Sequence, residues 1–180
     1  HNSRKKQLLD GVKRRLQKGA SIHAFMRQYG NLAQLAVNNK HLGLLKFLLD
    51  LEIDPNGRTV HRSLLSRALD GRWMDSDSIA GLAIISTLID YGANVNDDDI
   101  LNTAVTCGFS KTVQLLLASQ NIDHDTVVEA YKQLQSSHER VINNTSLTDD
   151  RKAELITTKN QISKMLSDWL ISRKPLYNGE

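Results

Sequence analysis

The chain contains few cysteine, proline and aromatic residues, and each of these shortages limits the structures that the chain can adopt. Its single cysteine, Cys107, excludes an internal disulfide framework and fits a reducing compartment, so we expect a cytoplasmic protein. The two prolines, Pro55 and Pro175, leave long stretches free to form helices. Aromatic residues make up 5% of the sequence and hydrophobic residues 40%, so the core must consist mainly of Leu, Ile, Val and Ala. No run approaches the ~20 apolar residues that cross a bilayer, and we expect no transmembrane segment.

Charge is distributed unevenly along the chain. The net charge is +3 over 180 residues, but residues 1–30 hold eight Lys and Arg against one Asp. This end therefore carries +7 and residues 31–180 carry −4. Such an asymmetry can steer nucleic acid, anionic lipid or an acidic partner toward one end. The alternative is a solvated helix face with no partner.

Three stretches repeat one pattern, at residues 36–49, 84–96 and 104–117. The shared features are small residues, a Gly or polar turn, paired aliphatic residues and a Leu-rich triplet; the second stretch closes with Gly-Ala-Asn-Val-Asn. A fourth match to the pattern lies at residues 12–23, and Gly19 is 33 residues before the matching Glu52. A period of this length indicates a repeat architecture, which presents a surface more readily than a deep catalytic pocket.

On these residues, the segment 12–123 resembles three ankyrin repeats preceded by a partial one. The resemblance implies an all-α fold, an ankyrin-type α-solenoid of stacked helix pairs with loops projecting to one side. We predict ankyrin-like repeats over residues 1–123 and a C-terminal helical-hairpin cap over 124–180. The repeat region divides into a partial unit (1–30) and repeats 31–62, 63–98 and 99–123. The small residues Ala36, Ala68 and Ala104 would let neighbouring first helices approach closely.

The chain departs from the ankyrin pattern in three ways. The Thr-Pro-Leu-His signature is degenerate in every repeat. The interval from Gly92 to Asp99 is 7 residues instead of 12, so we expect residues 97–99 to cap the next helix in place of a β-hairpin. The second repeat carries about eight extra residues within 71–81, which we expect to form a loop on a working face.

Helices are also expected at both ends of the chain. Apolar residues at helical spacing predict a helix over 5–18, with Gly19 as a left-handed C-cap. The same spacing predicts a helix over 125–142, and the sequence Ser146-Leu147-Thr148-Asp149 resembles a capping box that opens a second long helix. Trp169 lies on the apolar stripe of that helix, where a core position is the favoured interpretation.

Nothing in the sequence supports a catalytic, cofactor or metal site. Cys107 is the only obvious nucleophile, and it falls at a helix end where any small polar residue is common. The six histidines lack zinc-ligand spacing, and no glycine-rich phosphate-binding motif occurs. We therefore predict that the protein is not an enzyme and has no cofactor.

We predict instead a protein–protein interaction module. The candidate partner-binding residues lie in the loops, in the insertion and on the inward side of the first helices. They are Phe25, Arg27, Tyr29, Arg58, His61 and Arg62 in the loops, Arg72, Trp73 and Met74 in the insertion, and Asn39 and Arg67 facing inward. The alternative for Trp73 is that it folds back over the second repeat.

Two other functions stay open. Residues 4–18 could form an electrostatic anchor for nucleic acid or anionic lipid, whose binding would weaken steeply with salt. The chain begins at His1, so we also expect that it is a fragment, and it could be the targeting domain of a larger enzyme. Its degenerate repeats resemble those of effector proteins of intracellular bacteria, which implies delivery into a host cell.

Overall fold

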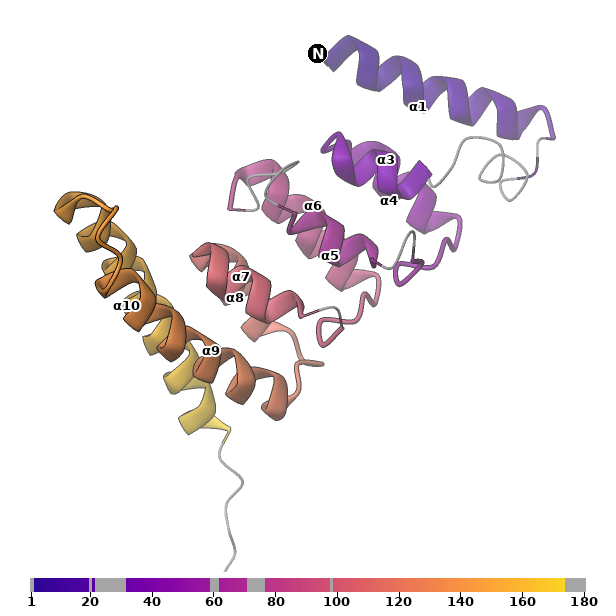
Figure 1. Ribbon diagram of the computed structural model, residues 1–180. Helices are drawn as coiled ribbons and strands as arrows, with labels where there is room; N and C mark the ends of the chain where they lie inside the picture. Colours follow the sequence, from indigo (N-terminus) through magenta and orange to yellow (C-terminus); the bar gives the residue numbers. More distant parts are fainter. Residues whose placement is uncertain are drawn as a thin grey trace, which may run out of the picture. The chain divides into compact units, whose positions relative to one another are not determined.

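The computed structural model describes residues 2–19, 21, 32–58, 62–70, 77–97 and 99–173 (Figure 1). Within these ranges every regular element is an α-helix, apart from a single bridge residue at Arg62. The predicted all-α class is confirmed for this part of the chain. The chain divides into two compact units, His1–Ala93 and Asn94–Glu180. This division falls inside the second predicted repeat, and the predicted domain boundaries stay a prediction.

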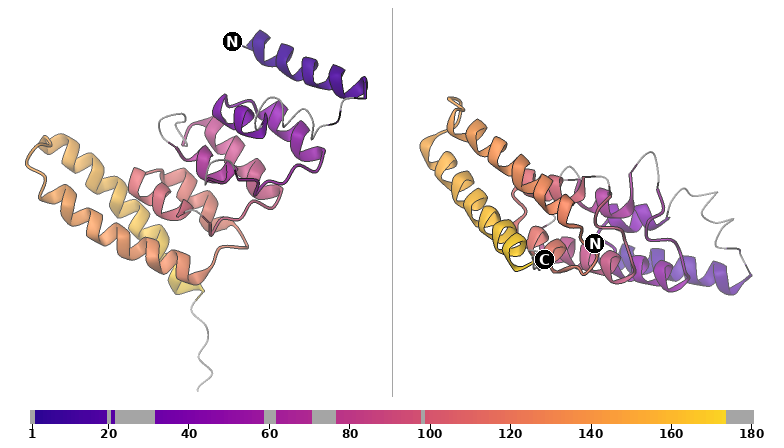
Figure 2. Two further views of the ribbon diagram at one scale, coloured as in Figure 1. Left: turned by 45° about the vertical axis from the view of Figure 1, so that its right-hand side comes forward. Right: turned by 90° about the horizontal axis from the view of Figure 1, so that it is seen from below.

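The first unit contains five described helices. They are α1 (Asn2–Gln17), α3 (Leu32–Asn38), α4 (Leu42–Asp50), α5 (Leu64–Ala68) and α6 (Ile79–Asp90). Helix α3 packs against α4 and α5, and α6 packs against the same two helices, so two helix pairs lie side by side (Figure 2). The core between them is aliphatic, and Ala36 and Ala68 are fully buried where the first helices meet. The predicted Leu- and Ile-rich core is thus present in this unit.

The second unit contains α7 (Ile100–Cys107), α8 (Ser110–Ala118), α9 (His124–Ile142) and α10 (Asp149–Ser172). Helix α7 packs against α8 and α9, and α10 packs against the same two helices. The two long helices lie side by side as a hairpin in both views of Figure 2. The pair α9–α10 therefore continues the alternation that α7 and α8 begin.

The turn that ends the first helix of a pair has the same backbone geometry in two predicted repeats. Lys40 and Gly108 each follow a buried alanine, Ala36 or Ala104, by four residues, and both have left-handed φ values of 51° and 74°. The amide after each of them donates to the carbonyl of that alanine, at 2.8 and 2.9 Å. This hydrogen bond closes the helix and turns the chain toward the second helix.

The second helices also end alike. Glu52 after α4 and Gly92 after α6 have φ values of 60° and 86°. In both turns the next amide donates to a buried leucine carbonyl, from Ile53 to Leu48 and from Ala93 to Leu88. Gly19 after α1 has φ 84°, so the predicted left-handed C-cap is confirmed. The common register read from the sequence is therefore visible in the backbone.

The last part of the range in which a loop was expected is helical. Residues 71–76 lie outside the described residues, but Ile79–Gly81 form the first turn of α6 and Gly81 is buried. The reason is a cap that the sequence analysis missed. The Ser78 hydroxyl accepts a hydrogen bond from the Gly81 amide at 3.1 Å, which starts the helix one turn earlier.

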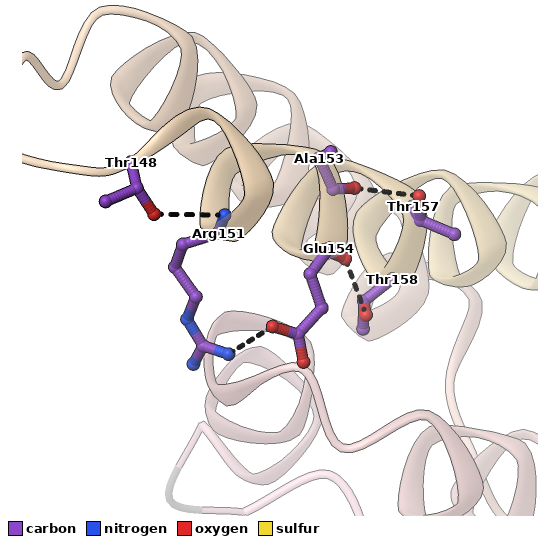
Figure 3. Close-up of polar contacts among 6 residues, drawn as sticks. All are labelled: Thr148, Arg151, Ala153, Glu154, Thr157 and Thr158. Atoms are coloured by element: carbon purple, nitrogen blue, oxygen red, sulfur yellow. Dashed lines mark hydrogen bonds and ion pairs between the residues drawn. The ribbon is translucent and has the colours of Figure 1, made fainter.

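One predicted cap is confirmed in position and one is corrected. Asp99 is the N-cap of α7, as predicted, although it has φ 53° and its side chain makes no capping hydrogen bond. The capping box at Ser146 is wrong, because the N-cap of α10 is Thr148, whose Oγ1 accepts from the Arg151 amide at 3.4 Å (Figure 3). Ser146 lies two residues before this N-cap, and its hydroxyl donates to Asn144 Oδ1 at 2.6 Å.

The interface between α9 and α10 contains a buried lysine. Lys159 is 6% exposed, and its Nζ donates to Ser137 Oγ at 2.6 Å. Burial lowers the pKa of Lys159, because the charged ammonium loses water that one hydroxyl does not replace. The buried Lys159 side chain therefore destabilises the packing of α9 against α10.

Replacing Lys159 with Met is expected to raise the free energy of unfolding at pH 7 by about 1 kcal/mol. Met keeps much of the length of the side chain, and the Ser137 hydroxyl still donates to the Leu134 carbonyl, so no donor is left unpaired. Urea unfolding of both proteins measures the difference. A loss of stability on this substitution would show that the Lys159–Ser137 bond outweighs desolvation.

The lowered pKa of Lys159 also predicts how the stability difference between the parent protein and Lys159→Met changes with pH. The pKa of Lys159 is lower in the folded than in the unfolded chain, so the unfolded chain binds more protons between the two values. The free energy of unfolding of the parent protein should therefore rise relative to that of Lys159→Met as the pH rises toward 10.5, the ordinary pKa of lysine. Parallel pH profiles of the two proteins would contradict this assignment.

Candidate interaction surface

Four of the eleven predicted partner-binding residues lie in the described part of the chain, and all four belong to the first unit. They are Asn39, Arg58, Arg62 and Arg67. The other seven, Phe25, Arg27, Tyr29, His61, Arg72, Trp73 and Met74, lie outside the described residues. The candidate surface is therefore built from the ends of α3 and α5 and from the loop between α4 and α5.

Asn39 and Arg67 lie at the C-terminal ends of two neighbouring helices. Asn39 follows α3 instead of lying within it, which corrects its predicted place in the first helix. Its side chain is exposed, and Nδ2 donates at 2.8 Å to the Leu35 carbonyl, which also accepts from the Asn39 backbone amide at 3.1 Å. Arg67 is half-buried in the last turn of α5, and α5 packs against α3. The two predicted residues are thus carried by adjacent helices.

Arg58 and Arg62 belong to the connection that leads from α4 to α5. Arg58 is exposed. Arg62 forms an ion pair with Asp70 at 3.1 Å, with 49% of the Arg62 side chain and 10% of the Asp70 side chain exposed. Arg62 precedes α5 and Asp70 follows it, so their ion pair joins the two ends of this helix. Arg62 therefore fixes the loop and also presents part of its guanidinium group to solvent. Arg62 therefore has a structural role that the sequence analysis did not predict.

The loop after α4 is fixed by hydrogen bonds to the loop after α6. The Asn56 amide donates to Asp54 Oδ1 at 2.9 Å, and Asn56 Nδ2 donates to the Gly92 carbonyl at 3.1 Å. Beside this bond, the Tyr91 hydroxyl donates to the Asp50 carboxylate. That hydrogen bond raises the pKa of Tyr91, with smaller contributions from burial and from the charges of Asp50 and Asp90. These contacts connect the ends of the two second helices.

The second unit repeats this arrangement with a second asparagine. Asn96 lies four residues after the left-handed Gly92, as Asn56 lies four residues after the left-handed Glu52. Asn96 Nδ2 donates to the Asn121 carbonyl at 2.7 Å, and Asn96 Oδ1 accepts from the Asp123 amide at 2.9 Å. Each asparagine thus ties its own loop to the next loop along the chain.

Replacing Asn96 with Ala should lower the free energy of unfolding by about 2 kcal/mol, because two hydrogen bonds to backbone groups are lost at once. Asn56→Ala is the matched control. It removes the longer bond to the Gly92 carbonyl and should cost about 1 kcal/mol or less. Chemical denaturation of both variants measures the difference. A smaller loss for Asn96→Ala than for Asn56→Ala would contradict the role given to Asn96.

Trp169 has a position that helical spacing alone could not predict. Its side chain is half-buried, and Nε1 donates to the Leu117 carbonyl at 3.0 Å. The Arg173 guanidinium lies 4.8 Å from the ring centroid, at cation–π distance. Trp169 therefore fastens the end of α10 to the last turn of α8, which accounts for it as a structural residue.

The described residues offer no group of three His, Cys, Asp or Glu side chains that could hold a metal ion. Cys107 is exposed at the end of α7. In the described ranges no helix is both long enough and apolar enough to cross a membrane. The chemistry on this surface is that of hydrogen-bonding side chains and guanidinium groups held on a helical frame.

Comparison of the chain with protein-family models, with curated proteins and with solved structures finds no match. The resemblance to ankyrin repeats therefore rests on the residues of this chain, and the family stays a prediction.

Proposed function

We propose that the protein is a protein–protein interaction module built as an ankyrin-type scaffold. The observation that carries the proposal is the pair of asparagine side chains that tie successive loops together, Asn56 to Gly92 and Asn96 to Asn121. Loops held in this way lose little conformational entropy when a partner binds. A preorganised row of loops is what a binding scaffold of stacked repeats requires.

The partner-binding residues of this proposal belong to the first unit: Asn39 and Arg67 at the C-terminal ends of α3 and α5, and Arg58 in the loop after α4. Arg58 and Arg67 supply guanidinium groups, which bind carboxylates in a bidentate geometry, and Asn39 supplies an exposed amide. Arginine is also enriched among the residues that dominate binding energy at interfaces. The proposed partner is a protein that presents acidic side chains to these residues.

The long helices α9 and α10 act as a cap in this proposal. Their packing against α7 and α8 buries Val127, Ala130 and Leu134 on one helix and Ile162 and Leu166 on the other. Most of the charged side chains of both helices are exposed. A stack of repeats needs a terminal element with a polar outer side, because each repeat leaves an apolar face for the next.

Affinity capture from cell lysate tests the proposed surface with two matched variants. Asn39→Asp/Arg58→Glu changes two exposed residues of the first unit. The control, Lys132→Glu/Gln135→Glu, makes the same net charge change at two exposed residues of α9. Thermal unfolding is measured for both variants, so that a lost interaction can be separated from a lost fold.

The proposal predicts a protein that the parent chain and the α9 control retain equally. Asn39→Asp/Arg58→Glu should retain at least about tenfold less of this protein, while its melting temperature is unchanged. Retention of the same proteins by all three chains would contradict the proposed surface. Loss in the α9 control alone would assign the interaction to the second unit instead.

A further inference from the structure

The N-terminal helix α1 buries one side and leaves its charges on the other. Val12 is 2% exposed, and Leu9 lies against α4, with its Cδ2 3.7 Å from the place of a Cβ on Gly43. Lys13 Nζ lies 5.2 Å from the centroid of the Phe47 ring. These contacts fix the rotation of α1 on the first unit, at whose edge it lies in Figures 1 and 2.

Three exposed basic side chains lie away from Val12: Arg14 on the opposite side of α1, Lys18 directly after the helix, and Lys6 on its flank, about 20° from Lys13. At 3.6 residues per turn, Lys6, Arg14 and Lys18 are placed about 120°, 200° and 240° around the helix axis from Val12. All three are exposed, and they extend over a rise of about 18 Å. The charge excess of residues 1–30 is therefore directed partly into a row on the outer side of one helix.

The side chains on the outer side of α1 distinguish between two polyanionic partners, a lipid bilayer and a nucleic acid. Helices that bind bilayers through their interface bury Trp, Phe or Leu in the acyl boundary. Among the described side chains of α1, the apolar ones, Leu9 and Val12, contact the protein itself or are buried. The outward side chains are Lys, Arg, Gln, Ser and Asp. Among the side chains of α1 that the structure describes, this side offers charge and hydrogen bonds and no apolar anchor for a membrane.

We propose that the outer side of α1 binds duplex DNA through its phosphate backbone, with Lys6, Arg14 and Lys18 as the phosphate contacts. An α-helix about 10–12 Å across fits the major groove of B-form DNA, which is about 12 Å wide. The basic row spreads over about 120° of the helix circumference, so it meets phosphates on both walls of a groove. The major groove of duplex RNA is too narrow to admit side chains in this way. This function is separate from the proposed protein-binding surface and uses none of its residues.

Fluorescence anisotropy with a labelled duplex of about two helical turns tests the proposal. Three phosphate contacts predict a slope near −2.7 for the logarithm of the binding constant against that of the salt concentration. Affinity should therefore fall about 40-fold between ~50 and ~200 mM salt. Duplexes of different base sequence should bind within about threefold of one another, because phosphate contacts carry no sequence information.

Two variants with equal charge change make the test specific. Lys6→Glu/Arg14→Glu/Lys18→Glu should weaken binding at ~50 mM salt by more than about tenfold. The control, Lys132→Glu/Arg140→Glu/Lys164→Glu, reverses two exposed lysines and one arginine on α9 and α10 and should bind within about threefold of the parent. If the first variant fails to fold, Lys6→Gln/Arg14→Gln/Lys18→Gln should still flatten the salt slope by about three times the single-contact value.

Equal weakening by the two reversal variants would overturn the proposal, since it would show an effect of net charge alone. Vesicles of phosphatidylserine and phosphatidylcholine are the parallel probe. Binding of the parent to these vesicles without binding to the duplex would also overturn it and would assign this side of α1 to a membrane. Failure of either kind leaves the affinity-capture result on the first unit unaffected, because the residues are different.

Discussion

Leu101→Ala is expected to lower the free energy of unfolding by about 3 kcal/mol. Leu101 lies in α7, which packs against α8 and α9, and its side chain is 0% exposed. Truncation removes its transfer free energy and leaves a cavity that neighbouring helices cannot close without moving. Urea denaturation followed by circular dichroism measures the loss.

Leu51→Ala is the matched control for this prediction. Leu51 follows α4, is 40% exposed and should cost less than about 1 kcal/mol on truncation. The two substitutions delete the same atoms, so their difference reports burial alone. Equal losses for Leu101→Ala and Leu51→Ala would contradict the position of α7 in the core of the second unit.

Gly108→Val is expected to cost about 3 kcal/mol, for two reasons that add. Gly108 has φ 74°, a left-handed conformation that costs an L-residue roughly 1–2 kcal/mol and a β-branched one more. A Cβ at this position would also lie 3.4 Å from the Thr158 methyl group on α10. The added methyl groups of valine would extend into the same contact.

Gly11→Val separates these effects from a general intolerance of larger residues. Gly11 lies inside α1, has ordinary helical backbone geometry, and would place a Cβ with nothing within 4 Å. Valine there should change the free energy of unfolding by less than about 0.5 kcal/mol. A loss at Gly11 as large as that at Gly108 would contradict the account of the turn after α7.

The sequence predicted the repeat register because few residue types satisfy the positions that define it. Ala36, Ala68 and Ala104 are fully buried, where a larger side chain would separate the first helices. After α6 the sequence marks the turn with a glycine, Gly92. After α4 the corresponding residue is Glu52, which only the alignment of the repeats identifies and which adopts the same left-handed backbone. Spacing therefore located turns that composition alone would have missed.

Helix starts were predicted less well, because several side chains compete to cap them. Ser78 begins α6 a turn before the repeat alignment would place it, and Thr148 caps α10 where Ser146 was expected. Ser146 lies two residues before the N-cap that α10 uses, and its hydroxyl donates to Asn144 in the preceding turn. A sequence pattern two or three residues long does not contain this information.

The candidate surface was predicted as a set of loops, but not the contacts that fix them. The asparagines at positions 56 and 96 stand out in the sequence as matching positions, yet their partners are backbone carbonyls of the following loop. The Asp50–Tyr91 pair joins residues 41 positions apart. Such contacts depend on how one repeat packs on the next, which the local sequence does not specify.

The central claim is that the first unit binds a protein partner through the loops and helix ends around α3 and α5. Hydrogen exchange of the chain, free and bound to the captured partner, tests it most directly. The account predicts slowed exchange in residues 39–41, 52–58 and 62–70 on binding, with little change in α9 and α10. Protection confined to α9 and α10, or no protection in the first unit, would contradict it.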